Sequence, residues 1–163
     1  MSEKAGILVL GWGNLSRGDD ALGPLFVAGL QEMLASDLRQ QVEFLDDYQL
    51  QVEHALDLEG RRHVLFVDAS LDCAPPFSAN PVHARRDTSY TSHALSAEAL
   101  MQVFEDLHGH VAPSATLLAL RGALFELGEP LSATANANLQ VALEWGLDWI
   151  RKTAQPPGVQ PRV

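Results

Sequence analysis

The sequence predicts an α/β fold, a three-layer α/β/α sandwich around a mostly parallel sheet of about five strands. Short apolar runs of strand length alternate along the chain with segments whose apolar residues recur every three or four positions. The run at 6–11 is continuously apolar, as in strands that are buried on both faces of a parallel sheet, and the run at 63–69 is an apolar run that stops at Asp68. No repeat or linker divides the chain, which predicts a single domain over 1–153 and a flexible tail at 154–163.

The first half of the chain begins with the strand at 6–11 and continues into a helix from Asp20 onward. Pro24 suits the first turn of that helix, where a missing backbone donor costs nothing. Two further strands, at 42–47 and 63–69, each end in acidic residues. The segment 48–59 between them has some helical character. The apolar face of the first helix consists of Leu22, Leu25, Phe26, Leu30, Met33 and Leu34.

The second half begins with an irregular, proline-interrupted segment at 70–94, in which 81–85 is expected to form a short edge strand. Ser96 is expected to cap the next helix. A strand at 115–122 follows, and Leu131-Ser132 opens a long C-terminal helix that ends near Lys152.

Composition excludes several classes of function. The chain has 163 residues, a formal net charge of −10 and no apolar run near the ~18 residues that a membrane span requires. The negative charge argues against a nucleic-acid binder, because lysine and arginine supply most of the affinity for phosphates. The N-terminus enters a strand without a signal-peptide pattern, so a cytoplasmic location is expected. The single Cys73 is expected to be a partly buried structural thiol.

The stretch Gly11-Trp12-Gly13-Asn14, followed by Asp19-Asp20, lies where the first strand passes into the first helix. Glycine adopts positive φ without steric cost, so this stretch predicts a sharp turn. Ligands in open α/β sheets bind outside the carboxyl ends of the strands. We therefore expect Asp19, Asp20, Asp46, Asp47, Asp68 and the loop that carries His93 to gather at that edge.

Carboxylates with one imidazole can be metal ligands or an acid–base set, and the residues alone leave both open. Structural roles compete with these. One of Asp19 and Asp20 is expected to cap the first helix, Asp68 could bond turn amides, and a lone loop histidine such as His93 is most often solvated.

A dinucleotide fingerprint fits the glycine turn poorly. Ser16 stands where the third glycine is needed, and Asp19 and Asp20 would repel a pyrophosphate at the helix N-terminus. No Gly-Lys-Ser or Gly-Lys-Thr of a Walker A loop occurs.

These residues resemble the maturation endopeptidases of [NiFe]-hydrogenases. The resemblance covers the chain to about residue 152 and rests on Gly11-Trp12-Gly13-Asn14, Asp19-Asp20-Ala21-Leu22-Gly23, Val67-Asp68-Ala69 and Ser92-His93. It implies an aspartyl-type endopeptidase that removes a C-terminal extension from the nickel-loaded large-subunit precursor.

The resemblance further implies that Asp20, Asp68 and His93 contact nickel that the precursor supplies, and that the enzyme holds no permanent metal or other cofactor. The three residues would position the scissile bond, and hydrolysis would follow through a metal-polarised carbonyl or a water activated by a carboxylate. Nothing in the sequence indicates a large obligate interface, so a monomer is expected.

Two positions depart from the family pattern. Many members have Glu at the position of Asp20. The shorter Asp side chain holds its carboxylate about one methylene group further back, without a change in its chemistry. Many also have Asp-Gly-Gly-Thr where this chain has Asp46-Asp47-Tyr48-Gln49-Leu50. The latter version is similar to the branch that serves soluble NAD-reducing or bidirectional hydrogenases.

Three alternatives remain: a peptidyl-tRNA-hydrolase-like esterase, which shares the GxGN opening, a non-catalytic nickel or other metal carrier, and a nucleotide-binding module. The net charge of −10 argues against the esterase, whose groove for tRNA is basic.

Overall fold

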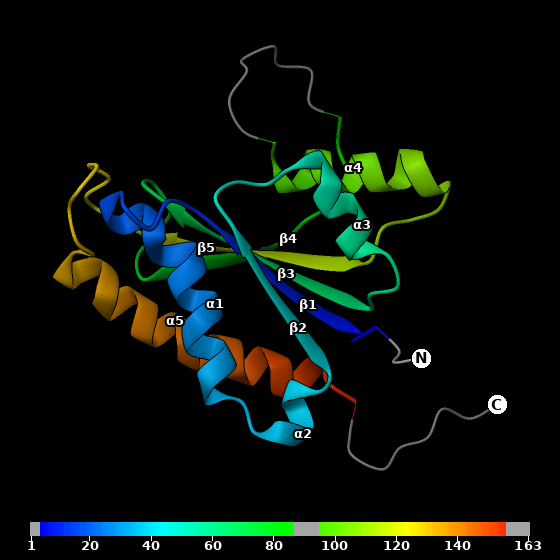
Figure 1. Cartoon of the computed structure of the whole chain (residues 1–163), viewed down its shortest axis with the longest axis horizontal. Helices are drawn as coiled ribbons and strands as arrows, with labels where there is room; N and C mark the ends of the chain where they lie inside the picture. Colours follow the sequence, from blue (N-terminus) through cyan, green and yellow to red (C-terminus); the bar gives the residue numbers. More distant parts are fainter. Residues whose placement is uncertain (1–3, 87–94, 156–163) are drawn as a thin grey trace.

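A computed structural model describes residues 4–86 and 95–155 and contains a five-stranded sheet with helices on both faces (Figure 1). In spatial order the strands are β2 (Val42–Asp47), β1 (Ile7–Trp12), β3 (His63–Ser70), β5 (Ser114–Arg121) and β4 (Phe77–Pro81). The first four are parallel, and β4 is an antiparallel edge strand. The α/β/α sandwich around a mostly parallel sheet is therefore confirmed.

One face of the sheet is covered by α1 (Leu22–Met33) and α5 (Ala133–Thr153). The other is covered by α3 (Ala55–Leu58) and α4 (Ala97–His108), as Figure 1 shows. Side chains alternate along each strand. Val9 and Leu65 face α1 and α5, whereas Leu10 and Phe66 face α3 and α4, and all four are fully buried.

Two short helices complete the chain between β1 and β3. One is α2 (Ser36–Arg39), which precedes β2. The other is the 3-10 helix η2 (Val52–His54), which continues into α3. The helical character expected over 48–59 is thus confined to seven residues, 52–58. Among the helices of residues 4–86 and 95–155, none combines the length and apolar composition that a membrane crossing needs.

Two local predictions, the Ser96 cap and the edge strand at 81–85, can be compared with the structure, and the structure adds a cap at Ser132. Ser96 and Ser132 cap α4 and α5, since their hydroxyls accept hydrogen bonds from Ala99 and Ala135. The edge strand expected at 81–85 is wrong in position, because β4 ends at Pro81. It begins at Phe77, whose partly buried ring packs against the α1–α5 core, and that tertiary contact selects the paired segment.

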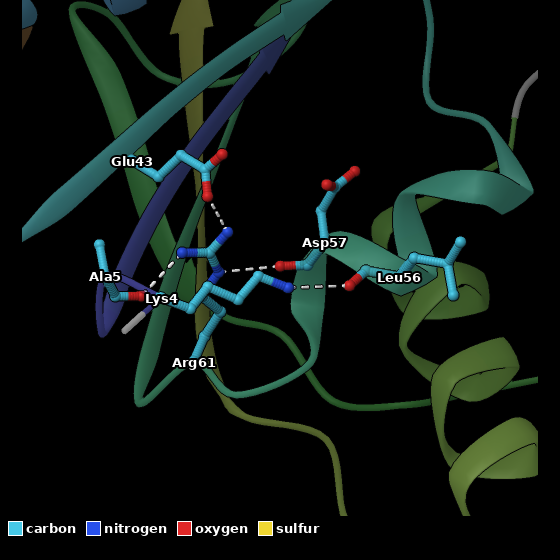
Figure 2. Close-up of polar contacts among 6 residues, drawn as sticks. All are labelled: Lys4, Ala5, Glu43, Leu56, Asp57 and Arg61. Carbon is cyan, nitrogen blue, oxygen red and sulfur yellow. Dashed lines mark hydrogen bonds and ion pairs between the residues drawn. The ribbon is translucent and has the colours of Figure 1, made fainter. Parts of the chain in front are cut away.

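The amino ends of the strands are joined by Arg61, whose guanidinium is fully buried (Figure 2). It donates to the Ala5 carbonyl at 2.7 Å and the Asp57 carbonyl at 2.9 Å, and it pairs with Glu43. Lys4 donates to the Leu56 carbonyl at 3.1 Å. This polar cluster ties α3 to the start of β1, at the opposite edge from the predicted site.

The organisation into one domain over 1–153 with a tail stays a prediction. The C-terminal helix α5 ends at Thr153, and residues 156–163 lie outside the described residues.

Candidate functional site

Asp20 and Asp68 lie at the carboxyl edge of the sheet on neighbouring segments. Asp20 belongs to the 3-10 turn η1 (Gly18–Ala21), which connects β1 to α1. Asp68 follows Val67, and Val67 pairs with Gly11 of β1 in the parallel ladder. Burial is the main reason that the pKa of Asp68 is raised, and the negative charge of the nearby Asp20 adds to it.

The glycine turn at the end of β1 brings the first strand and the start of α1 close together. Gly13 has a φ of +151°, and a Cβ there would overlap the carbonyl oxygen of Asp20. A Cβ at Gly11 would lie 2.6 Å from the carbonyl oxygen of Gly23. Because both contacts are to backbone atoms, larger residues would separate the strand from the helix. The glycines are therefore needed for the position of Asp20.

Asn14 holds the Asp20 carboxylate directly. Its backbone amide donates to Asp20 Oδ2 at 2.9 Å, and its own side-chain oxygen accepts from the Ser16 amide at 2.8 Å. The second bond is an Asx turn, which stabilises the loop locally. In phosphate-binding loops, backbone amides at such a turn donate to the anion of a ligand. Here the Asn14 amide donates to the carboxylate of Asp20 instead.

Asp68 has a pKa raised to about 7. Burial raises this pKa most, and the negative charge of Asp20 raises it further. Hydrogen bonds from the Ala69 backbone and the Trp12 side chain lower it, but by less. Trp12 also packs edge-on against Phe66, with ring centroids 6.1 Å apart. A partly buried carboxyl group that exchanges its proton near neutral pH can take up a divalent cation in place of the proton.

Neither Asp19 nor Asp20 caps the first helix, so that expectation is wrong: α1 has no side-chain cap, and its N-cap residue is Ala21. Asp19 is fully buried and accepts hydrogen bonds from residues that follow β5. Burial raises the pKa of Asp19, but hydrogen bonds from Ser132, Leu124 and Ala123 outweigh it, and the pKa lies below its usual value. Asp19 is therefore a buried, ionised structural anchor.

The segment that Asp19 holds is the β5–α5 loop, residues 122–132. The carboxylate accepts from the amides of Ala123, Leu124 and Ser132 at 2.7, 2.9 and 2.8 Å, and from the Ser132 hydroxyl at 2.8 Å. Four more hydrogen bonds join this loop to the turn before α1. They are Gly18 N to Glu129 O, Asp19 N to Leu124 O, Gly128 N to Ser16 O, and Arg17 Nε to Phe125 O.

Sequence reasoning did not connect the β5–α5 loop with the site. The loop has no motif of its own, and the partners are more than a hundred residues apart in the chain. The available signal was the presence of two adjacent acids, Asp19 and Asp20, of which the family resemblance assigns only Asp20 to the site.

The acids after β2 have separate roles. Asp46 is exposed, whereas Asp47 contacts His54 Nε2 at 3.2 Å and accepts from the Tyr48 amide at 2.6 Å. His54 Nδ1 in turn accepts from the Gln51 amide at 2.8 Å. The Asp47–His54 pair thus organises the segment after β2.

A hollow of about 350 Å³ opens between this segment and the glycine turn. Its lining consists of Gly13, Asn14, Leu15, Ser16, Pro24, Asp46, Asp47 and Tyr48. The Tyr48 hydroxyl accepts from the Asn14 side-chain amide at 2.9 Å, which links the two walls.

His93 lies outside the described residues, so its place relative to Asp20 and Asp68 stays a prediction. Within residues 4–86 and 95–155, no group of three or more His, Cys, Asp or Glu side chains is arranged to hold a metal ion. Cys73 is partly buried, and its thiol donates to the Ala119 carbonyl at 3.5 Å.

Comparisons with known proteins identify solved structures that share this fold. No known family profile matches the chain, and no curated protein sequence matches it. Among solved structures, the chain is similar to the hydrogenase maturating endopeptidase HybD from Escherichia coli, with 26% identity and a TM-score of 0.72 over 91% of this chain and 93% of that one.

Two archaeal structures share the fold. One is the [NiFe] hydrogenase maturation protease HycI from Thermococcus kodakarensis, with 20% identity and a TM-score of 0.70 over 92% of this chain and 95% of that one. The other is a hydrogenase 2 maturation peptidase from a Thaumarchaeota archaeon, with 24% identity and a TM-score of 0.63 over 90% of this chain and 98% of that one. The resemblance predicted from the sequence is confirmed by these neighbours, whereas the soluble-hydrogenase branch stays a prediction.

Proposed function

We propose that this chain is a [NiFe]-hydrogenase maturation endopeptidase, the kind of enzyme whose fold it shares over about nine-tenths of its length. It is a peptide hydrolase that removes the C-terminal extension from the large-subunit precursor of a hydrogenase. The observation that carries this function is the convergence of Asp20 and Asp68 at the carboxyl edge, on the glycine turn that carries the sequence resemblance.

Asp20 and Asp68 are proposed to contact the nickel that the precursor carries, with His93 as the third contact. Carboxylate oxygens and an imidazole nitrogen suit such a divalent ion. Two interacting carboxylates repel each other when both are ionised, and a cation between them removes that repulsion. The site therefore favours a precursor that already carries its metal, and we propose that this metal, with no resident metal or other cofactor, is the one that the site contacts.

Contact with the metal positions the scissile bond, which is the main catalytic contribution of these residues. Water adds to the peptide carbonyl, the carbon–nitrogen bond breaks, and the leaving amine takes up a proton. Polarisation of the carbonyl by the metal, or activation of the water by a carboxylate, accelerates this step. A monomer in the cytoplasm stays our prediction.

The test combines purified enzyme with nickel-loaded and nickel-free precursor and follows cleavage by mass spectrometry. We expect cleavage of the loaded precursor only, and loss of that cleavage in Asp20→Ala and Asp68→Ala. Asp37→Asn is the matched control, because Asp37 is an exposed acid on α2. Equal cleavage of both precursors, or full activity of Asp20→Ala, would contradict the proposal.

Three further assays on the purified protein separate the alternatives. Tight stoichiometric nickel binding without a precursor and without cleavage would indicate a metal carrier. A thermal shift on addition of NAD would indicate a nucleotide-binding module, and cleavage of a peptidyl-tRNA ester would indicate the esterase.

A further inference from the structure

Asp19 and Asp20 are adjacent in sequence, yet their carboxylates lie in opposite surroundings. Asp19 is fully buried against the β5–α5 loop, whereas Asp20 is partly exposed beside Asn14. Both belong to the short 3-10 turn η1, in which neighbouring side chains point about 120° apart. An anchor on one side chain that fixes the backbone of such a turn therefore also fixes the direction of the Cα–Cβ bond of the other.

All four partners of the Asp19 carboxylate are donors. Oδ2 accepts from the amides of Ala123 and Leu124 and from the Ser132 hydroxyl, while Oδ1 accepts from the Ser132 amide. An ionised carboxylate satisfies this arrangement because both of its oxygens only accept. An asparagine would place its NH₂ group against at least one of these donors. The surroundings are therefore specific for aspartate.

The Ser132 hydroxyl extends the anchor into α5. It donates to Asp19 and accepts from the Ala135 amide at 3.1 Å as the cap of that helix. The turn that carries Asp20 is thereby tied to a helix of 21 residues that packs along the sheet. By contrast, among the hydrogen bonds of residues 4–86 and 95–155, the Asp20 carboxylate has only the one from Asn14.

We propose that Asp19 is a positioning residue: its four hydrogen bonds to the β5–α5 loop hold the turn so that the Asp20 carboxylate meets the metal on the precursor. The β5–α5 loop is then part of the active site although it need not touch the reacting atoms. This inference rests on the proposed function for its catalytic consequence, but the structural link between Asp19 and Asp20 can be measured without it.

Two variants weaken the anchor in different ways. Asp19→Asn keeps the size of the side chain and removes the second acceptor oxygen. Ser132→Pro leaves Asp19 intact and removes two of its donors together with the hydroxyl that caps α5, and proline tolerates the φ of −68° at this position. Ile150→Val is the control, since Ile150 is fully buried near the other end of α5 and its truncation lowers stability without touching the anchor.

The first readout is hydrogen exchange of the Asn14 amide, measured by NMR on the full chain well below each melting temperature. Because this amide donates to Asp20, its exchange reports whether Asp20 stays in place. We expect exchange to accelerate at least tenfold in Asp19→Asn and Ser132→Pro and to stay within threefold in Ile150→Val. Unchanged exchange at Asn14 in both anchor variants would overturn the proposal.

The second readout is the kinetics of cleavage of nickel-loaded precursor. Small misplacements of a reacting group can cost about a hundredfold in rate. We expect kcat to fall at least tenfold in both anchor variants while KM changes less than threefold, and both constants to stay near wild type in Ile150→Val. An equal loss of kcat in Ile150→Val would show a general stability effect and overturn the proposal.

If Asp19→Asn does not fold, Ser132→Pro decides both readouts alone. If the wild type cleaves no precursor, the proposed function fails, and the exchange at Asn14 still decides whether Asp19 positions Asp20.

Discussion

The backbone amide of Asn14 donates to the carboxylate of Asp20 at 2.9 Å. This bond joins the two halves of the motif: the glycine turn that ends β1 and the acidic turn that begins the first helix. It requires Gly13, because any Cβ at that position would overlap the Asp20 carbonyl oxygen. The position of the candidate metal contact therefore depends on backbone packing as much as on the choice of side chain.

Replacing Gly13 by alanine should displace Asp20. The overlap with the backbone of Asp20 cannot be relieved by rotating a side chain, so we expect a loss of roughly 2–4 kcal/mol of stability, and of most activity. Gly109→Ala is the control: Gly109 has a φ of +73°, but no atom lies within 4 Å of the point that a Cβ would occupy there. That change should cost only about 1 kcal/mol and preserve cleavage. Chemical denaturation and precursor cleavage measure both effects.

The stability of the protein should depend on the protonation of Asp68. Its pKa is about 7 in the folded protein and near 3.8 when unfolded, so folding favours the protonated form. The stabilisation is complete below pH 4 and is lost as the pH rises through 7. We expect Asp68→Asn to be more stable than wild type by roughly 2–4 kcal/mol at pH 8, with a difference that shrinks toward pH 4.

Denaturation in urea at several pH values measures this difference. A gap between Asp68→Asn and wild type that does not change with pH would contradict a raised pKa at Asp68.

Arg61 should matter for stability and not for cleavage. Its loss would leave the partly buried carbonyls of Ala5 and Asp57 without their donor and Glu43 without its partner, at a cost of about 2–4 kcal/mol in Arg61→Met. Lys152→Met is the comparison, because the exposed pair of Lys152 with Asp148 contributes about 0.5 kcal/mol or less. Thermal unfolding gives the stabilities. A loss of kcat in Arg61→Met, measured where it is folded, would show that the amino edge influences the site.

Cys73→Ser should retain full activity. The thiol donates weakly to the Ala119 carbonyl, and a hydroxyl can make the same contact. We expect unchanged kcat and a change in stability of about 1 kcal/mol or less. Inactivation by this substitution would indicate a nucleophilic cysteine and a different mechanism.

Local patterns in the sequence determined much of this protein. The alternation of apolar runs and helical periodicity predicted the sandwich, because burial on one or both faces imposes those periods. The serine before the α4 segment predicted the cap at Ser96, since capping depends on a side chain and the next few amides. The ends of β1 and β3 placed Asp20 and Asp68 at one edge, because parallel strands share their direction.

Long-range contacts decided the rest. The family resemblance singled out Asp20, but the sequence left the role of Asp19 open. That role depends on the β5–α5 loop, which comes a hundred residues later and surrounds Asp19 with donors. Nor could the sequence place β4, whose pairing depends on how Phe77 packs against the core. Local periodicity reports which face of an element is buried, but only the tertiary structure decides which distant backbone amides meet a buried carboxylate.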